Sequence, residues 1–143
     1  MAEQIFWEDV ETSAEIPSLT KKPTSQQLVQ WAGASGDFYQ IHYDKDFALD
    51  NNLPGIIVHG AFKSAWLGQL LGDWVGLKGK IKIFSCGYRG MDVPGDTLAC
   101  KGTITNKYIE GGEHLVELDI WLENGKGEKT TPGKAIVALP SRS

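Results

Sequence analysis

Residues 59–76 read HGAFKSAWLGQLLGDWVG, and this stretch decides the fold. Its apolar side chains recur at spacings that cover most of a helical wheel, whereas polar residues are few. The apolar positions are Phe62, Ala65, Trp66, Leu67, Leu70, Leu71 and Trp74. A helix that is apolar nearly all round is a buried helix, so we expect the rest of the chain to wrap around it.

After this helix the sequence changes from a helical period to alternation. Four runs rich in β-branched residues follow, separated by turn sequences with glycine, proline and asparagine. They cover residues 80–89, 96–109, 113–123 and 127–139. Short connections indicate antiparallel pairing, and a further strand near residues 15–22 can join the sheet edge. We therefore predict an α+β fold, the hot-dog architecture, in which a curved antiparallel sheet wraps around one buried helix.

Length and composition are those of one ordinary globular domain. The chain has 143 residues, 41% of them hydrophobic and 22% charged, so a single domain over residues 1–143 is expected. A net charge of −4 argues against nucleic acid as a partner, because binding to phosphate needs a dense basic surface.

The sequence also predicts where the protein works. No apolar stretch reaches the about 20 residues of a membrane span, and the acidic N-terminus lacks an apolar leader segment. The two cysteines lack the CxxC spacing of zinc or redox sites and fit reduced thiols. We expect no membrane partner and a cytoplasmic location.

Two shorter helices are expected before the buried one. The first has Thr24 or Ser25 as its N-cap, Gln27 near the capping-box position, and a glycine at its end. The second starts after Asp44 and stops at the turn sequence NNLPG. The segment SGDFYQIHYD between them, residues 35–44, is therefore predicted to be a loop.

This loop contains an acid and an imidazole five residues apart, Asp37 and His42. Side chains at that spacing diverge on a helix or a strand but can converge across a loop. Imidazole titrates near pH ~6.5 and a carboxylate stays ionised, so the two together could hold and activate one water. In a simpler interpretation, Asp37 ends the helix or forms an Asx-turn, and His42 bonds a backbone group.

The start of the buried helix is a second candidate feature. It begins at Val58-His59-Gly60 with no Ser, Thr, Asp or Asn to satisfy its first amides. A bare glycine there lets an acyl oxygen approach the Gly60 N–H, where the helix dipole stabilises developing negative charge. Alternatively, Gly60 serves only to pack the helix start closely against the sheet.

Taken together, these motifs resemble a known family. SGDFYQIHYDKDFA followed by IIVHGAF is similar to the MaoC-like (R)-specific enoyl-CoA hydratases and 3-hydroxyacyl-ACP dehydratases. The resemblance extends from the helix at residues 24–34 to GKAIVALP and includes the VPGDTL turn. It implies that Asp37 and His42 activate a water, that His42 carries the proton, and that the Gly60 amide polarises a thioester carbonyl.

The resemblance also implies an activity and partners. The reaction would interconvert trans-2-enoyl and (R)-3-hydroxyacyl thioesters carried on coenzyme A or acyl carrier protein. It needs no cofactor, and the three histidines of the chain show no metal-ligand spacing. We expect His59, Tyr39 and Ala61 to contribute to substrate binding, with His59 also bracing the loop by a hydrogen bond. A homodimer, or a heterodimer with a related hot-dog subunit, is the expected assembly.

The sequence departs from the family pattern at three positions. Tyr39 and Gln40 stand where the family has Asn-Pro, and Gly68 stands where many members have serine. Two other functions therefore stay open. One is a hot-dog thioesterase, in which a carboxylate activates water against the thioester carbonyl. The other is a non-catalytic subunit of an acyl-processing complex.

Overall fold

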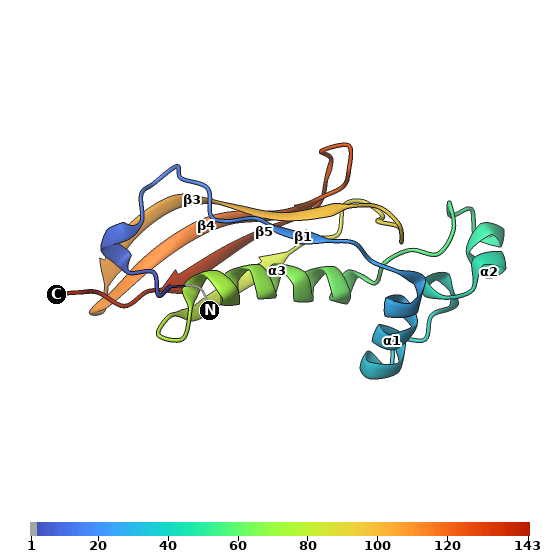
Figure 1. The fold of residues 1–143 in the computed structure, drawn as a ribbon, viewed down its shortest axis with the longest axis horizontal. Helices are drawn as coiled ribbons and strands as arrows, with labels where there is room; N and C mark the ends of the chain where they lie inside the picture. The colour runs from blue at the N-terminus through green and yellow to red at the C-terminus, as the bar shows by residue number, and fades with distance from the viewer. Residues whose placement is uncertain (1–2) are drawn as a thin grey trace.

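The computed structural model describes residues 3–143 and consists mainly of one curved sheet and one long helix (Figure 1). The sheet has five strands in the order β1-β3-β4-β5-β2, and every neighbouring pair is antiparallel. The strands are β1 (Leu19–Lys21), β2 (Lys80–Cys86), β3 (Leu98–Glu110), β4 (Glu113–Glu123) and β5 (Lys129–Ala138). The predicted hot-dog architecture is confirmed, and the early strand joins the sheet edge beside β3.

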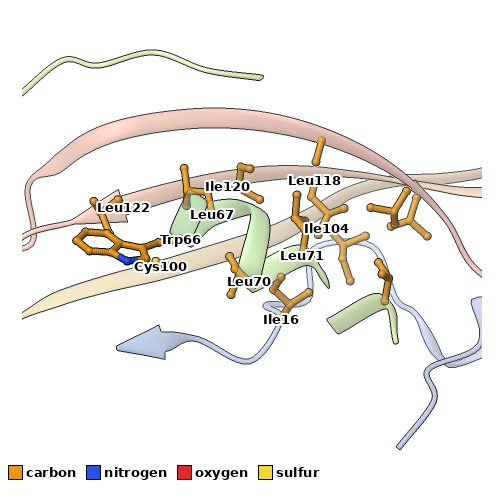
Figure 2. Packing of buried hydrophobic residues seen from close by; sticks show 14 of the residues in the cluster. Ile16, Trp66, Leu67, Leu70, Leu71, Cys100, Ile104, Leu118, Ile120 and Leu122 are labelled. Carbon is orange, nitrogen blue, oxygen red and sulfur yellow. The ribbon is translucent and has the colours of Figure 1, made fainter. Parts of the chain in front are cut away.

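Helix α3 (Gly60–Val75) lies along one face of this sheet (Figure 1). Its residues Leu67 and Leu71 have no exposed surface and are packed in one cluster with strand residues (Figure 2). The strand residues shown in that cluster include Cys100, Ile104, Leu118, Ile120 and Leu122. The alternation of β3 and β4 therefore supplies one apolar face, and the helix covers it.

The helix is covered on one side only. Ala61, Ala65, Gln69, Gly72 and Asp73 are exposed along its other side. The prediction that this helix is buried nearly all round was therefore wrong within residues 3–143. Alanine and glycine count as apolar in the sequence pattern, but they have little side-chain area and so gain little from leaving water.

The smaller helices lie beyond the end of the sheet at which α3 begins (Figure 1). They are α1 (Ser25–Ser35) and α2 (Lys45–Asp50), with the 3-10 turn η2 (Gln40–His42) between them, whereas the 3-10 turn η1 (Trp7–Asp9) lies at the opposite end of the molecule against β4. Thr24 caps α1 in a reciprocal capping box with Gln27, and Asp44 caps α2. Gly36 ends α1 with φ 79°, a left-handed conformation that glycine adopts without strain. Within residues 3–143, none of the helices has the length and apolarity to cross a membrane.

The packing of α3 against the sheet should dominate stability. Leu71→Ala is expected to lower the free energy of unfolding by about 2–5 kcal/mol, because it leaves a cavity in a fully buried cluster. Leu77→Ala is the matched control, since Leu77 is 91% exposed and should change stability by no more than about 0.5 kcal/mol. Chemical denaturation measures both. Equal effects of the two substitutions would contradict this account of the core.

Candidate active site

The loop between α1 and α2 meets the start of α3. Polar side-chain atoms of Asp37, His42 and His59 all lie within 4.8 Å of one another. Two hydrogen bonds hold the loop there: the Ile57 N–H donates to the Ile41 carbonyl at 3.1 Å, and the His42 ring contacts the Ile57 carbonyl. The predicted convergence of the acid and the imidazole therefore occurs, and His59 joins them.

His42 is held in one orientation. Its Nδ1 lies 2.7 Å from the Ile57 carbonyl oxygen. A carbonyl oxygen only accepts, so Nδ1 carries the proton and the neutral ring has its lone pair on Nε2. Nε2 lies 3.8 Å from Asp37 Oδ2. The ring is 7% exposed, so only a small part of it is open to solvent or substrate.

Asp37 is the more open partner, with 48% of its side chain exposed. Its Oδ1 accepts the Tyr39 N–H at 3.4 Å, and its own N–H donates to Ser35 Oγ at 3.2 Å. The Asx-turn and the backbone partner of His42, proposed as the simpler interpretation, are thus both present. They fix the two side chains and leave Asp37 Oδ2 facing His42 Nε2.

This arrangement suits one water molecule. Two acceptors cannot hydrogen-bond each other, but at 3.8 Å apart both can lie about 2.8 Å from one water oxygen. A water that donates both of its protons to Asp37 and His42 directs its lone pairs away from them. Such a water is oriented as a nucleophile, and His42 Nε2 can take its proton.

His59 is fully buried and stacks on His42. The ring centroids are 3.8 Å apart and the planes are inclined by 20°. Within residues 3–143, neither ring nitrogen of His59 makes a hydrogen bond of ordinary geometry, although the Asp37 backbone is close enough to raise its pKa, so the bracing hydrogen bond stays a prediction. Burial lowers the His59 pKa, and the neighbouring His42 lowers it further, while Asp37 opposes both effects weakly. His59 therefore supports His42 by ring contact.

The three residues form a poor metal site despite their proximity. Imidazole binds a metal ion through a lone pair that lies in the plane of the ring. The nearly parallel, stacked rings of His42 and His59 direct their lone pairs into separate planes, so one ion cannot lie in both. Together with the Asp37 carboxylate, the cluster fits water and protons better than a coordinated ion.

Gly60 opens α3 beside this cluster. No side chain caps the helix at its N-cap residue, His59. A pocket of about 330 Å³ is lined there by His42, Gly60, Lys63, Tyr88 and Met91, among others. A Cβ atom on Gly60 would lie 2.9 Å from the Tyr88 ring, so no larger residue fits without moving that ring. Close packing, the alternative role of Gly60, is thus also present, although its contact is Tyr88, which follows β2.

The remaining predicted substrate contacts lie at the edge of the cluster. Tyr39 is 51% exposed, and its ring makes edge contacts with His42 at 6.3 Å and Phe47 at 6.0 Å between centroids. Ala61 is exposed in the first turn of α3. Their roles, like those of Asp37, His42 and Gly60, stay predictions.

Sequence reasoning missed a buried ionic network in the same pocket wall. Lys63 Nζ donates to Asp92 Oδ2 at 3.0 Å, and Thr130 Oγ1 donates to the same oxygen at 2.7 Å. All three residues are buried. The available signal was a lysine in the first turn of a helix, where the dipole disfavours a positive charge.

Comparison with known proteins agrees with this fold. A family model for the MaoC like domain matches residues 7–122. The chain is 31% identical to the fatty acid synthase subunit beta of Saccharomyces cerevisiae over 91 residues, which is 62% of this chain and 4% of the relative. The chain thus spans only a small fraction of the length of the curated relatives it matches.

Two solved structures share the fold over nearly their whole length. An (R)-hydratase from A. caviae involved in PHA biosynthesis has a TM-score of 0.83 and 22% identity, covering 93% of this chain and 99% of that one. The ChsH1-ChsH2 complex from Mycobacterium tuberculosis has a TM-score of 0.79 and 21% identity, covering 90% and 98%. The fold and site are those of a hot-dog domain with an Asp-His cluster at the start of its central helix. This chain belongs to the MaoC-like domain family.

The buried His59 predicts a pH dependence of stability. Because its pKa in the folded protein is lowered, the folded state resists protonation more than the unfolded state does. The free energy of unfolding should be level above the unfolded pKa of about 6.5 and should fall as pH decreases below it. Denaturation at several values between about pH 7 and about pH 5 measures this before most carboxylates titrate.

The control variant keeps an aromatic ring at position 59 and removes the nitrogens that take up a proton. His59→Phe should flatten this pH dependence, whereas His114→Gln, on β4, should leave it unchanged. His42 and Asp37 face the same ring and remain in both variants. An unaltered slope in His59→Phe would show that another group is responsible.

Proposed function

We propose that the chain is a hydro-lyase that interconverts trans-2-enoyl and (R)-3-hydroxyacyl thioesters. The observation that carries this proposal is the pair of facing acceptors, Asp37 Oδ2 and His42 Nε2, beside the uncapped start of α3 at Gly60. Membership of the MaoC-like family supports it. So does the fold shared with an (R)-hydratase, although at that identity the likeness is one of fold alone.

In the hydration direction, the proposed reaction begins with the water held by Asp37 and His42. Its oxygen adds to C3 of the enoyl thioester while His42 Nε2 takes a proton. The negative charge that develops on the thioester oxygen is stabilised by the Gly60 N–H at the positive end of the helix dipole. The imidazolium then returns a proton to C2, which completes the 3-hydroxyacyl product and restores neutral His42. Dehydration is the reverse sequence.

The proposed substrate is carried on coenzyme A or acyl carrier protein, and the reaction itself requires no redox cofactor. The similarity to a fatty acid synthase subunit favours fatty acyl chains. We also propose a homodimer, or a heterodimer with a related hot-dog subunit. The uncovered side of α3 supports a second subunit, and one structural neighbour is a two-component complex. A cytoplasmic location stays a prediction.

The decisive experiment follows the conjugated enoyl band of crotonyl-CoA in the ultraviolet, beside a thiol-trapping assay. The wild-type protein should remove the band without releasing thiol. Asp37→Asn and His42→Gln should each lower kcat by about 10²–10⁴-fold, because the first removes the carboxylate charge that orients the attacking water and the second removes the base that takes its proton. Folding of each variant is checked by circular dichroism.

Matched controls separate the site from general charge effects. Asp46→Asn, at an exposed position of α2, should keep wild-type kcat. Thiol release by the wild-type protein would instead indicate a thioesterase that uses the exposed Asp37 carboxylate. If neither assay responds with crotonyl-CoA, longer enoyl-CoA and enoyl-ACP substrates are tested. A lack of response to these as well would favour the alternative that the chain is a non-catalytic subunit of an acyl-processing complex.

A further inference from the structure

Asp92 contacts both ends of the turn that presents Gly60. Its backbone carbonyl accepts the Val58 N–H at 2.8 Å, and its Oδ2 accepts Lys63 Nζ at 3.0 Å. Val58 lies two residues before Gly60, and Lys63 lies three residues after it. The segment 58–63 contains the His59 ring and the first amides of α3. A single residue therefore ties this segment at both ends to the chain that follows β2.

Asp92 and Lys63 form a clamp on this segment, and both of their side chains are buried and charged. Asp92 and Lys63 are each 2% exposed. Lys63 Nζ also donates to the Gly90 carbonyl at 2.9 Å, and Thr130 Oγ1 donates to Asp92 Oδ2 at 2.7 Å. Asp92 Oδ1 is buried without a hydrogen-bond partner within residues 3–143.

These features argue against a role in stability alone. A buried ion pair contributes little net stability, because desolvation offsets the attraction, and an unpaired carboxylate oxygen is a further cost. What such a pair can contribute is one defined geometry, since breaking it leaves an uncompensated buried charge. The geometry defined here is that of the helix start.

The clamp also forms part of the pocket wall. Lys63 and Gly90 line the same pocket as His42 and Gly60. Lys63 Nζ lies 5.8 Å from the centroid of the Tyr88 ring, and that ring packs on Gly60. A shift of Lys63 relative to Asp92 would therefore move the Gly60 amide relative to both Tyr88 and His42.

We propose that Asp92 is a positioning residue for the reaction, acting with Lys63 and Thr130 to hold residues 58–63 so that the Gly60 amide keeps its place beside His42. This inference rests on the proposed function. Asp92 is buried and acts through the helix start. A displacement of about 1 Å in such a group can lower a rate about 10²-fold, so weakening the clamp should lower kcat more than it raises KM.

Two neighbouring threonines of β5 offer a matched test. Thr130→Val removes the hydroxyl that donates to Asp92, whereas Thr131→Val removes a buried hydroxyl without a described partner. Both changes are nearly isosteric. Thr130→Val should lower kcat at least about threefold with KM within about twofold, because removing one donor loosens the clamp without unpairing Lys63. Thr131→Val should keep wild-type kcat and KM.

A charge-neutral double variant tests the ion pair itself. Lys63→Met combined with Asp92→Asn removes both charges while keeping side-chain volume and an amide partner for Thr130. Neither buried charge is then left unpaired, so the melting temperature should lie within about 5 °C of wild type, whereas kcat should fall at least about tenfold. If the double variant does not fold, the threonine pair decides alone.

Amide hydrogen exchange makes the test independent of catalysis. The amides of Val58 and Lys63, which donate to the Asp92 and His59 carbonyls, should exchange faster in Thr130→Val than in Thr131→Val or wild type, because the helix start is less constrained. Equal exchange and equal kcat in the two threonine variants would overturn the proposal. A wild-type protein without hydratase activity, but with the expected difference in exchange, would overturn the proposed function and leave the clamp as an organiser of the pocket.

Discussion

The burial of one side of α3 against the curved sheet is the constraint on which the rest of the structure depends. Leu67 and Leu71 fill the apolar face that β3 and β4 present, and this fixes where the helix can begin. Its first turn then lies at the end nearest α1, where Trp31 stacks on Phe62 (Figure 1). Asp37 and His42 therefore lie in the segment between α1 and α2, whereas the Gly60 amide belongs to the long helix packed on the sheet.

Hydrogen bonds from the backbone hold the polar side chains of the site in place. The Ile57 carbonyl fixes the proton of His42 on Nδ1, and an Asx-turn fixes Asp37 Oδ1, so Asp37 Oδ2 and His42 Nε2 are left to face each other. The interpretation of the loop as an Asx-turn with a backbone-bonded His42 and its interpretation as a pair that can hold water are therefore two parts of one arrangement. The stacked His59 adds a ring contact that limits rotation of His42 without competing for Nε2.

The features that could be predicted from the sequence are those that depend on residues close together along the chain. Alternation located the strands, breakers placed Asp37 and His42 on a loop, and the missing cap indicated the open start of α3. The sequence did not predict contacts between distant segments, such as Lys63 with Asp92 or Thr130 with Asp92, which are 29 and 38 residues apart. The exposed side of α3 was missed because a pattern of small apolar residues does not reveal whether anything covers them.

The stacked imidazoles have a consequence for reversibility. Burial, and then the neighbouring His42, lower the pKa of the stacked His59, so His59 resists taking a proton beside His42. In the proposed mechanism His42 takes its proton from water in one direction and from the acyl chain in the other, and it returns to the same neutral state after either. A site built in this way has no preferred resting form for hydration or dehydration. Net flux would then follow the relative concentrations of the two thioesters and of the steps that supply or remove them.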